Sequence, residues 1–203
     1  LSYRGENELR FVDYFCIYGF RVTDSILNIP GARYVKFIPT GTTEYNAIQK
    51  WNKFSISMDN FTLLYPSGPL MNFMTDLQEI STEKHLEHRQ KVLDFLDQLL
   101  TKYSGLRVLY KPFPGTYTND PIKSELAQWF KKGKIELTYI SPKKLYSAVD
   151  LVLWDSISTG FAESVVCGVP VIVFNTKFEY AQVSPWGKKV NDGLTQAGVQ
   201  CFN

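Results

Sequence analysis

The sequence predicts an α/β fold with a doubly wound parallel sheet, and two observations lead to this prediction. Segments with strand patterns alternate with segments of helical pattern from residue 61 to the C-terminal end. Several of the strand segments are apolar throughout, which is typical of strands buried on both faces of a parallel sheet. We therefore expect helices on both sides of the sheet and a ligand site beyond the carboxyl ends of the strands.

The predicted strands are short apolar runs that end at proline, glycine or small polar residues. In chain order they cover residues 61–66, 106–113, 135–140, 149–154 and 169–174, and a sixth begins at VQCF, 199–202. A further short strand is expected at 34–39, which ends at Pro39 and is followed by a turn-like Thr-Gly-Thr-Thr stretch. The rest of the first sixty residues has no clean period, apart from one or two helical turns expected within 44–52.

Helical patterns fill the intervals between these strands. The strongest begins at Ser81 and ends near Gly105, and its leucine, valine and phenylalanine side chains recur along one face. Further helices are expected at 121–132, 141–148, 159–167 and 188–197. Gly168 directly follows the helix at 159–167, where a glycine commonly closes a helix.

Composition and charge are those of an ordinary soluble globular protein. Of the 203 residues, 44% are apolar and 21% are charged, and the net charge of +2 is too small to indicate a general nucleic-acid binder. No apolar run approaches the roughly 20 residues that cross a bilayer. We expect residues 1–59 to be a linker or the remnant of a preceding domain of a longer protein. Residues 60–203 are expected to form one Rossmann-like domain.

The loop after the predicted strand 149–154 carries the clearest candidate binding motif. It reads Asp-Ser-Ile-Ser-Thr-Gly and leads into a helix. A helix N-terminus has unpaired N–H groups and the positive end of the helix dipole, so an anion can bind there. Ser156, Ser158 and Thr159 can add hydroxyl donors. The motif alone leaves an alternative equally open, in which Ser158 or Thr159 only caps the helix.

Other strand ends and the following helix add candidate ligand contacts. Glu163 lies one helical turn after Thr159, and its carboxylate can accept hydrogen bonds from a ribose diol; a charge at a helix edge is the alternative. Lys111 ends a strand beside two prolines, and its ammonium can neutralise a diphosphate, although a surface lysine is an equal alternative. Ser67 and Gly68 form a second small loop after a strand, which turn chemistry explains as well.

Metal and proton-transfer chemistry have weaker support. His85 and His88 are spaced i, i+3 within a helix, a spacing that can bind a metal, but a solvated helix face is favoured, so we expect no metal site. Neither histidine is a strong general-base candidate, and Glu179 is the weak carboxylate candidate for catalysis. No G-x-G-x-x-G follows a predicted strand, which disfavours a Rossmann oxidoreductase.

Taken together, these motifs resemble the C-terminal nucleotide-binding domain of GT-B-fold glycosyltransferases. The resemblance covers roughly residues 60–203. The LRVLYKPFPG segment resembles the strand end of bacterial capsule and teichoic-acid transferases, including CDP-glycerol glycerophosphotransferase-like and Kdo-transferase-like enzymes, with Phe113 in place of the usual histidine. In the helix-start motif, the residues that carry the resemblance are Asp155, Ser158, Thr159, Gly160, Glu163, Gly168 and Pro170.

The resemblance implies a glycosyltransferase that uses a nucleotide-activated sugar or polyol phosphate in bacterial cell-envelope polysaccharide synthesis. It implies that Ser158 and Thr159 hold the donor phosphates and that Glu163 holds the ribose. No metal or cofactor is implied, and the catalytic base would come from an N-terminal domain. The full set of expected donor-binding residues is Ser67, Gly68, Lys111, Tyr139, Ile140, Ser156, Ser158, Thr159 and Glu163.

The resemblance also bears on partners and location. The expected partners are the nucleotide-activated donor and a glycan or lipid-linked acceptor, with no nucleic acid. We expect a cytoplasmic location, with peripheral association at the inner face of the membrane through regions outside this chain. Two alternatives stay open: a non-catalytic nucleotide-binding or interaction domain, and a nucleotide-sugar epimerase of the same fold.

Overall fold

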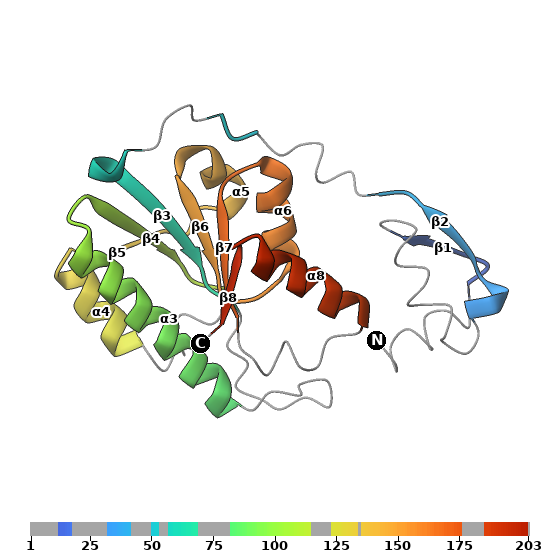
Figure 1. Cartoon of the computed structure of the whole chain (residues 1–203), viewed down its shortest axis with the longest axis horizontal. Coiled ribbons are helices and arrows are strands. Elements are labelled where there is room, and N and C mark those ends of the chain that lie inside the picture. Colours follow the sequence, from blue (N-terminus) through green and yellow to red (C-terminus); the bar gives the residue numbers. More distant parts are fainter. Residues whose placement is uncertain are drawn as a thin grey trace. The chain divides into compact units, whose positions relative to one another are not determined.

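The computed structural model describes residues 12–17, 32–41, 50–52, 57–68, 82–114, 123–133, 135–175 and 185–202. The chain divides into two compact units, residues 1–47 and 48–203, and Figure 1 shows the elements of each. Within the described residues, no helix combines the length and the apolar character that a membrane span requires.

The smaller unit contains a two-stranded parallel sheet. Strand β1 (Tyr14–Ile17) pairs with β2 (Lys36–Pro39), and a 3-10 turn, η1 (Ala32–Tyr34), precedes β2. The side chains of Ile17, Ala32 and Val35 form its small buried core. The pattern at 34–39 predicted β2, whereas β1 was missed because its YFCI sequence has no clean alternation. Most of the helical turns expected at 44–52 lie outside the described residues.

The larger unit is built on a six-stranded sheet in which every neighbouring pair is parallel. The strand order is β5-β4-β3-β6-β7-β8, so the chain winds outward from β3 in one direction and from β6 in the other. This order confirms the predicted doubly wound α/β fold. The strands are β3 (Phe61–Pro66), β4 (Leu106–Lys111), β5 (Ile135–Leu137), β6 (Leu151–Trp154), β7 (Val171–Asn175) and β8 (Gln200–Phe202).

The helices lie where the helical patterns predicted them, with boundaries that shift by a few residues. Gly168 follows α6 with φ = 88°, a left-handed conformation that favours glycine, and its N–H bonds to the last carbonyls of the helix. The helices are α3 (Thr82–Lys102), α4 (Lys123–Lys131), α5 (Pro142–Leu145), α6 (Thr159–Cys167) and α8 (Pro185–Gln196), with 3-10 turns η3 (Met58–Asn60) and η5 (Tyr146–Ala148).

Both faces of the sheet are covered, which explains why the strands read as continuous apolar runs. On one face, Tyr65 and Val108 pack in a core cluster with α3 residues such as Leu93. On the other face, the indole of Trp154 donates a hydrogen bond to Ser164 Oγ of α6 at 3.1 Å. A strand covered on both sides gains from apolar residues at every position, not at alternate ones.

Residues just before the sheet also belong to the larger unit. The backbone N–H of Trp51 bonds to the Cys167 carbonyl at 3.0 Å, and its indole Nε1 donates to the Val149 carbonyl at 3.0 Å. The described segment 50–52 therefore packs against the end of α6 and the start of the segment that leads into β6.

Candidate functional site

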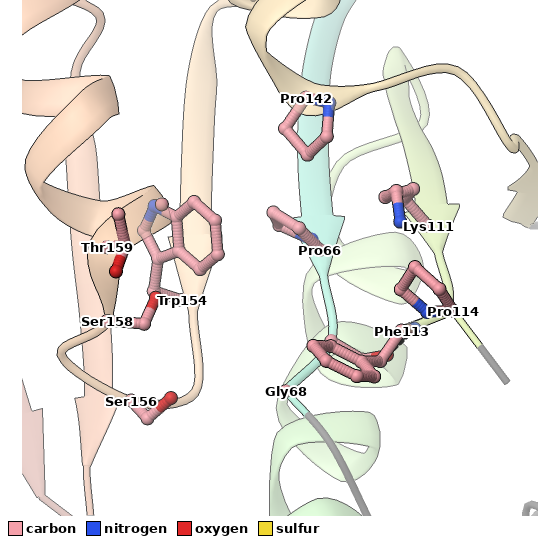
Figure 2. A pocket seen from close by; sticks show the side chains of 12 residues that line it. Pro66, Gly68, Lys111, Phe113, Pro114, Pro142, Trp154, Ser156, Ser158 and Thr159 are labelled. Atoms are coloured by element: carbon pink, nitrogen blue, oxygen red, sulfur yellow. Dashed lines mark hydrogen bonds between the residues drawn. The ribbon is translucent and has the colours of Figure 1, made fainter. Parts of the chain in front are cut away.

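A cleft of about 310 Å³ opens at the carboxyl ends of β3, β4 and β6. It lies between β3 and β6, where the strand order reverses, and this is where ligands bind in doubly wound sheets. Figure 2 shows the side chains from β6 and α6 facing those from β3 and β4 across the cleft. The lining residues are Pro66, Ser67, Gly68, Lys111, Phe113, Pro114, Pro142, Trp154, Ser156, Ser158, Thr159 and Gly160.

One wall of the cleft is the start of α6. Ser158 is the N-cap residue, with extended backbone (φ −124°, ψ 178°), but its hydroxyl makes no capping hydrogen bond. The alternative in which the Ser158 hydroxyl caps the helix is therefore not realised. The N–H groups in the first turn of a helix have no partner within the helix. Ser156 and Thr159 line the same wall (Figure 2), although the Ser156 hydroxyl donates to Asp155 Oδ1 at 3.4 Å.

A close backbone–ring contact fixes this wall. A Cβ on Gly160 would stand 2.3 Å from Cη2 of Trp154, so only glycine allows the first turn of α6 to approach the indole. The Tyr146 hydroxyl donates to the Gly160 carbonyl at 3.1 Å. Burial, with a smaller contribution from the Glu163 charge, raises the Tyr146 pKa, so this hydroxyl stays protonated as a donor.

Lys111 forms part of the opposite wall. It ends β4, is partly buried, and its ammonium donates to the Pro112 carbonyl at 2.9 Å. Burial lowers the Lys111 pKa because removing the ammonium from water disfavours its charged form. Among the described residues that line the cleft, Lys111 carries the positive charge. An anion in the cleft would compensate the lost hydration.

Beneath the cleft, the buried carboxylate of Asp155 joins the loop after β6 to the loop after β3. It accepts the Gly68 backbone N–H, at 3.1 Å to Oδ1 and 2.9 Å to Oδ2, and the Tyr65 hydroxyl at 3.1 Å. Burial is the main cause that raises the Tyr65 pKa, so the hydroxyl remains a donor. A Cβ on Gly68 would stand 2.9 Å from Asp155 Oδ1, so glycine permits this approach.

Arg89 of α3 completes this buried network. Its Nη2 lies 3.8 Å from Asp155 Oδ2 and donates to the Gly68 carbonyl at 2.7 Å. The Tyr110 hydroxyl lies 3.5 Å from Arg89 Nη1 and donates to Ser67 Oγ at 3.2 Å. The Phe113 backbone N–H also donates to Ser67 Oγ, at 3.2 Å. The Ser67 hydroxyl is therefore used by internal hydrogen bonds, although Ser67 lines the cleft.

His88 does not lie on a solvated helix face, and the expectation that it would is wrong. Its side chain is only 7% exposed and stacks on Phe174 of β7, with ring centroids 5.9 Å apart. Its Nε2 lies 2.9 Å from the Asp155 carbonyl oxygen. A carbonyl only accepts, so Nε2 carries the hydrogen, and burial lowers the His88 pKa in favour of the neutral ring. The side chain of His85 lies outside the described part of the structure.

Three of the expected donor contacts lie outside the cleft lining. Glu163 is buried, and its Oε1 lies 3.0 Å from Lys143 Nζ of α5. Tyr139 and Ile140 lie between β5 and α5 and are 69% and 51% exposed. The structure thus brings together Ser67, Gly68, Lys111, Ser156, Ser158 and Thr159. The catalytic candidate Glu179 lies outside the described residues.

Sequence reasoning did not find Arg89, Tyr65 or Tyr110 as parts of this site. All three lie within the apolar patterns that predicted α3, β3 and β4, and nothing in those patterns marks a polar network. Their roles depend on contacts between elements far apart in the chain. In the ranges that the structure describes, no group of three or more His, Cys, Asp or Glu side chains could hold a metal ion.

Over residues 1–202, the sequence matches a protein-family model described as LIC12162 family transferase. The match therefore extends through both compact units. No curated protein matches the chain.

Proposed function

The chain belongs to the LIC12162 family of transferases, and from this premise we propose that the cleft binds the diphosphate of a nucleotide-activated donor. The reaction we propose is that of a GT-B-type glycosyltransferase. It transfers a sugar or a polyol phosphate during synthesis of a bacterial cell-envelope polysaccharide. The donor is a substrate, and no metal or cofactor is part of the proposal.

One observation carries this proposal: the start of α6 and Lys111 face each other across a cleft at the switch point of the sheet. On the α6 wall, backbone N–H groups and the hydroxyls of Ser158 and Thr159 provide hydrogen-bond donors. On the other wall, Lys111 provides a point charge. Donors fixed in advance stabilise the negative charge that develops on a diphosphate leaving group.

The balance of charge beneath the cleft supports a single anionic ligand. Arg89 and Asp155 lie 3.8 Å apart and both are buried, so their charges largely compensate each other. The field in the cleft then comes mainly from Lys111 and from the α6 dipole. A diphosphate therefore suits the cleft better than a neutral metabolite does.

The volume indicates that only part of the donor lies in this cleft. At about 310 Å³ it is at the lower end of the range for ligand pockets. We propose that the diphosphate end occupies it, while the ribose and base extend past Pro142. Lys143, the next residue, pairs with Glu163, so the proposed ribose partner lies beside this exit. Tyr139 and Ile140 then contact the base.

A catalytic base must come from elsewhere in the protein. The described lining residues include no histidine, aspartate or glutamate, and Phe113 places an aromatic ring in the cleft. Glu179 remains the weak candidate in this chain. The same observation favours the second candidate function, a non-catalytic nucleotide-binding domain. For the enzyme, the acceptor we propose is a glycan or lipid-linked glycan at the cytoplasmic face of the membrane.

Calorimetric titration with UDP, GDP, CDP and CMP donors tests the proposal. We expect binding of one nucleotide class, and we expect both Glu163→Ala and Glu163→Gln to weaken it because the ribose partner is lost. Glu136→Gln is the matched control, since it removes an exposed carboxylate paired with Arg107 on the same sheet. If the folded wild-type protein binds none of these nucleotides, the donor-site proposal is wrong.

A further inference from the structure

Asp155 stands out because it connects two halves of the sheet that the backbone barely joins at the cleft. The ladder between β3 and β6 pairs Leu63 with Leu151 and Leu64 with Val152, and it stops before the carboxyl ends. By contrast, β3 and β4 are in register along six residue pairs. Beyond Leu64, the described contact between the loop after β3 and the loop after β6 is therefore made by the Asp155 side chain.

The Asp155 carboxylate makes this contact with both of its oxygens. Both accept the N–H of Gly68, which is 87 residues away in sequence, and Oδ2 also accepts the Tyr65 hydroxyl. The carbonyl of Asp155 is held separately by His88. The residue is thus fixed at its backbone by α3 and uses its side chain to hold the β3 loop.

Asp155 is not suited to contact the ligand itself. It is only 6% exposed and is not among the residues that line the cleft. Its negative charge would repel a phosphate, but the Arg89 guanidinium lies beside it as a counter-charge. Arg89 also donates to the Gly68 carbonyl, so the same peptide segment is held from two sides.

We propose that Asp155 is a positioning residue for the anion site. Its carboxylate holds the Ser67-Gly68 loop at the distance from the start of α6 at which both loops contact one diphosphate. Arg89 is its buried counter-charge. This inference rests on the proposed function, because it assigns a role to Asp155 in the same cleft.

The first experiment measures affinity for two probes, inorganic pyrophosphate and CDP, by calorimetry. Asp155→Ala removes both acceptor oxygens, and we expect its affinity for pyrophosphate to fall at least tenfold. Asp155→Asn keeps one acceptor for the Gly68 N–H, and we expect a loss of only about two- to fivefold. Wild-type affinity in a folded Asp155→Ala variant would overturn the proposal.

The matched control is Asp150, at the other end of β6. Its Oδ2 accepts the Thr62 backbone N–H of β3 at 2.8 Å, so it makes the same kind of bond between the same two strands. Asp150→Asn and Asp150→Ala should lower stability but leave the pyrophosphate affinity within twofold of wild type. An equal loss of affinity in the Asp150 and Asp155 variants would mean that general destabilisation is the cause, and would overturn the proposal.

Hydrogen–deuterium exchange without ligand supplies a readout that a general loss of stability does not give. We expect Asp155→Ala to speed exchange of the Gly68 amide strongly, while Asp155→Asn speeds it little. The Gly168 amide, which donates to carbonyls at the end of α6, should be unchanged. Equal acceleration of the two amides would contradict positioning. If Asp155→Ala does not fold, the affinities of Asp155→Asn and Asp150→Asn decide, since only the first should weaken pyrophosphate binding.

The outcomes separate this inference from the proposed function. Pyrophosphate binding that depends on Asp155, without binding of any nucleotide, supports the positioning role and contradicts the donor proposal. Nucleotide binding that is unaffected in Asp155→Ala supports the donor proposal and contradicts the positioning role. A wild-type protein that binds neither pyrophosphate nor any nucleotide contradicts both.

Discussion

Ser67 and Ser158 hold similar places in the fold, because each follows a strand of the parallel sheet and each lines the same cleft. Their hydroxyls differ in use. Ser67 is 5% exposed and accepts hydrogen bonds from Tyr110 and Phe113, whereas Ser158 is exposed and makes no capping bond. A serine at a strand end can thus serve the protein or a ligand, and its surroundings decide which.

The difference arises from what surrounds each loop. The β3 loop lies between α3 and β4, which bring Arg89 and Tyr110 against it. The β6 loop leads directly into α6, and the Ser158 hydroxyl at its N-cap makes no hydrogen bond to the helix. We therefore regard the β3 loop as held in place mainly by hydrogen bonds within the protein, and the α6 wall as the main source of hydrogen-bond donors for a ligand.

The largest expected effect comes from disturbing the α6 wall at Gly160. In Gly160→Ala, the new Cβ would clash with the Trp154 ring, which is buried and cannot move freely. We expect a loss of about 3 kcal/mol in the free energy of unfolding, at the upper end for overpacking. Urea denaturation measures it, and nucleotide affinity should fall as well.

Gly193→Ala is the control for this change. Gly193 lies in α8, and a Cβ there meets nothing within 4 Å. We expect this variant to gain up to about 1 kcal/mol from helix propensity. If Gly160→Ala were as stable as wild type, the close packing of α6 on Trp154 would not be what fixes this wall.

The second prediction compares alanine substitutions at the two serines. Ser67→Ala removes the hydrogen bonds that the Tyr110 hydroxyl and the Phe113 N–H donate to Ser67 Oγ, so we expect it to cost about 1–3 kcal/mol of stability. Ser158→Ala should change stability by less than about 0.5 kcal/mol but weaken nucleotide binding several-fold. Thermal unfolding and calorimetry measure the pair. If both substitutions lowered stability equally, the Ser67 hydroxyl would not be bonded within the protein more strongly than the Ser158 hydroxyl.

The smallest effect concerns His88, which holds the backbone of the β6 loop. Burial lowers its folded-state pKa below the unfolded value, so the folded protein resists protonation of the ring. This contribution to stability is fully present above the unfolded pKa of about 6.5. It is lost as the pH falls from there through the lower folded-state pKa. His88→Gln keeps an N–H donor but does not titrate.

Urea denaturation between pH 5 and 8 checks this prediction. Stability of the wild type should fall more steeply on acidification below about pH 6.5 than that of His88→Gln. The other titrating groups are common to both proteins, so the difference between the two curves reports His88. Identical slopes would mean that the imidazole is not held neutral beneath the β6 loop.

Most of the larger unit could be predicted from the sequence. Apolar runs and helical spacing are local signals, and they located all six strands and the helices between them. The position of Gly168 also predicted where α6 ends. The first unit was harder, because β1 has no alternation and pairs with a strand about twenty residues away.

The candidate site was predictable only in part. Ser158, Thr159 and Lys111 were found because each lies at the end of a strand or at the start of a helix. His88 was misplaced because helical spacing shows which residues share a face but not which face packs on a sheet. Arg89 and Tyr110 had no local signal, since their partners come from other elements. The nucleotide itself stays a prediction.

The two aspartates that flank β6 have a mechanical consequence. Strands β3 and β6 are paired at only two residue positions. Asp150 and Asp155, which flank β6, connect the two strands at either end, because each carboxylate accepts a backbone N–H of β3 or of the loop after it. Under a pulling force, β3 and β6 should therefore separate before β3 and β4 do. A diphosphate bound to the loops after β3 and β6 would add a third connection between these strands, so the liganded protein should resist their separation more strongly than the free protein.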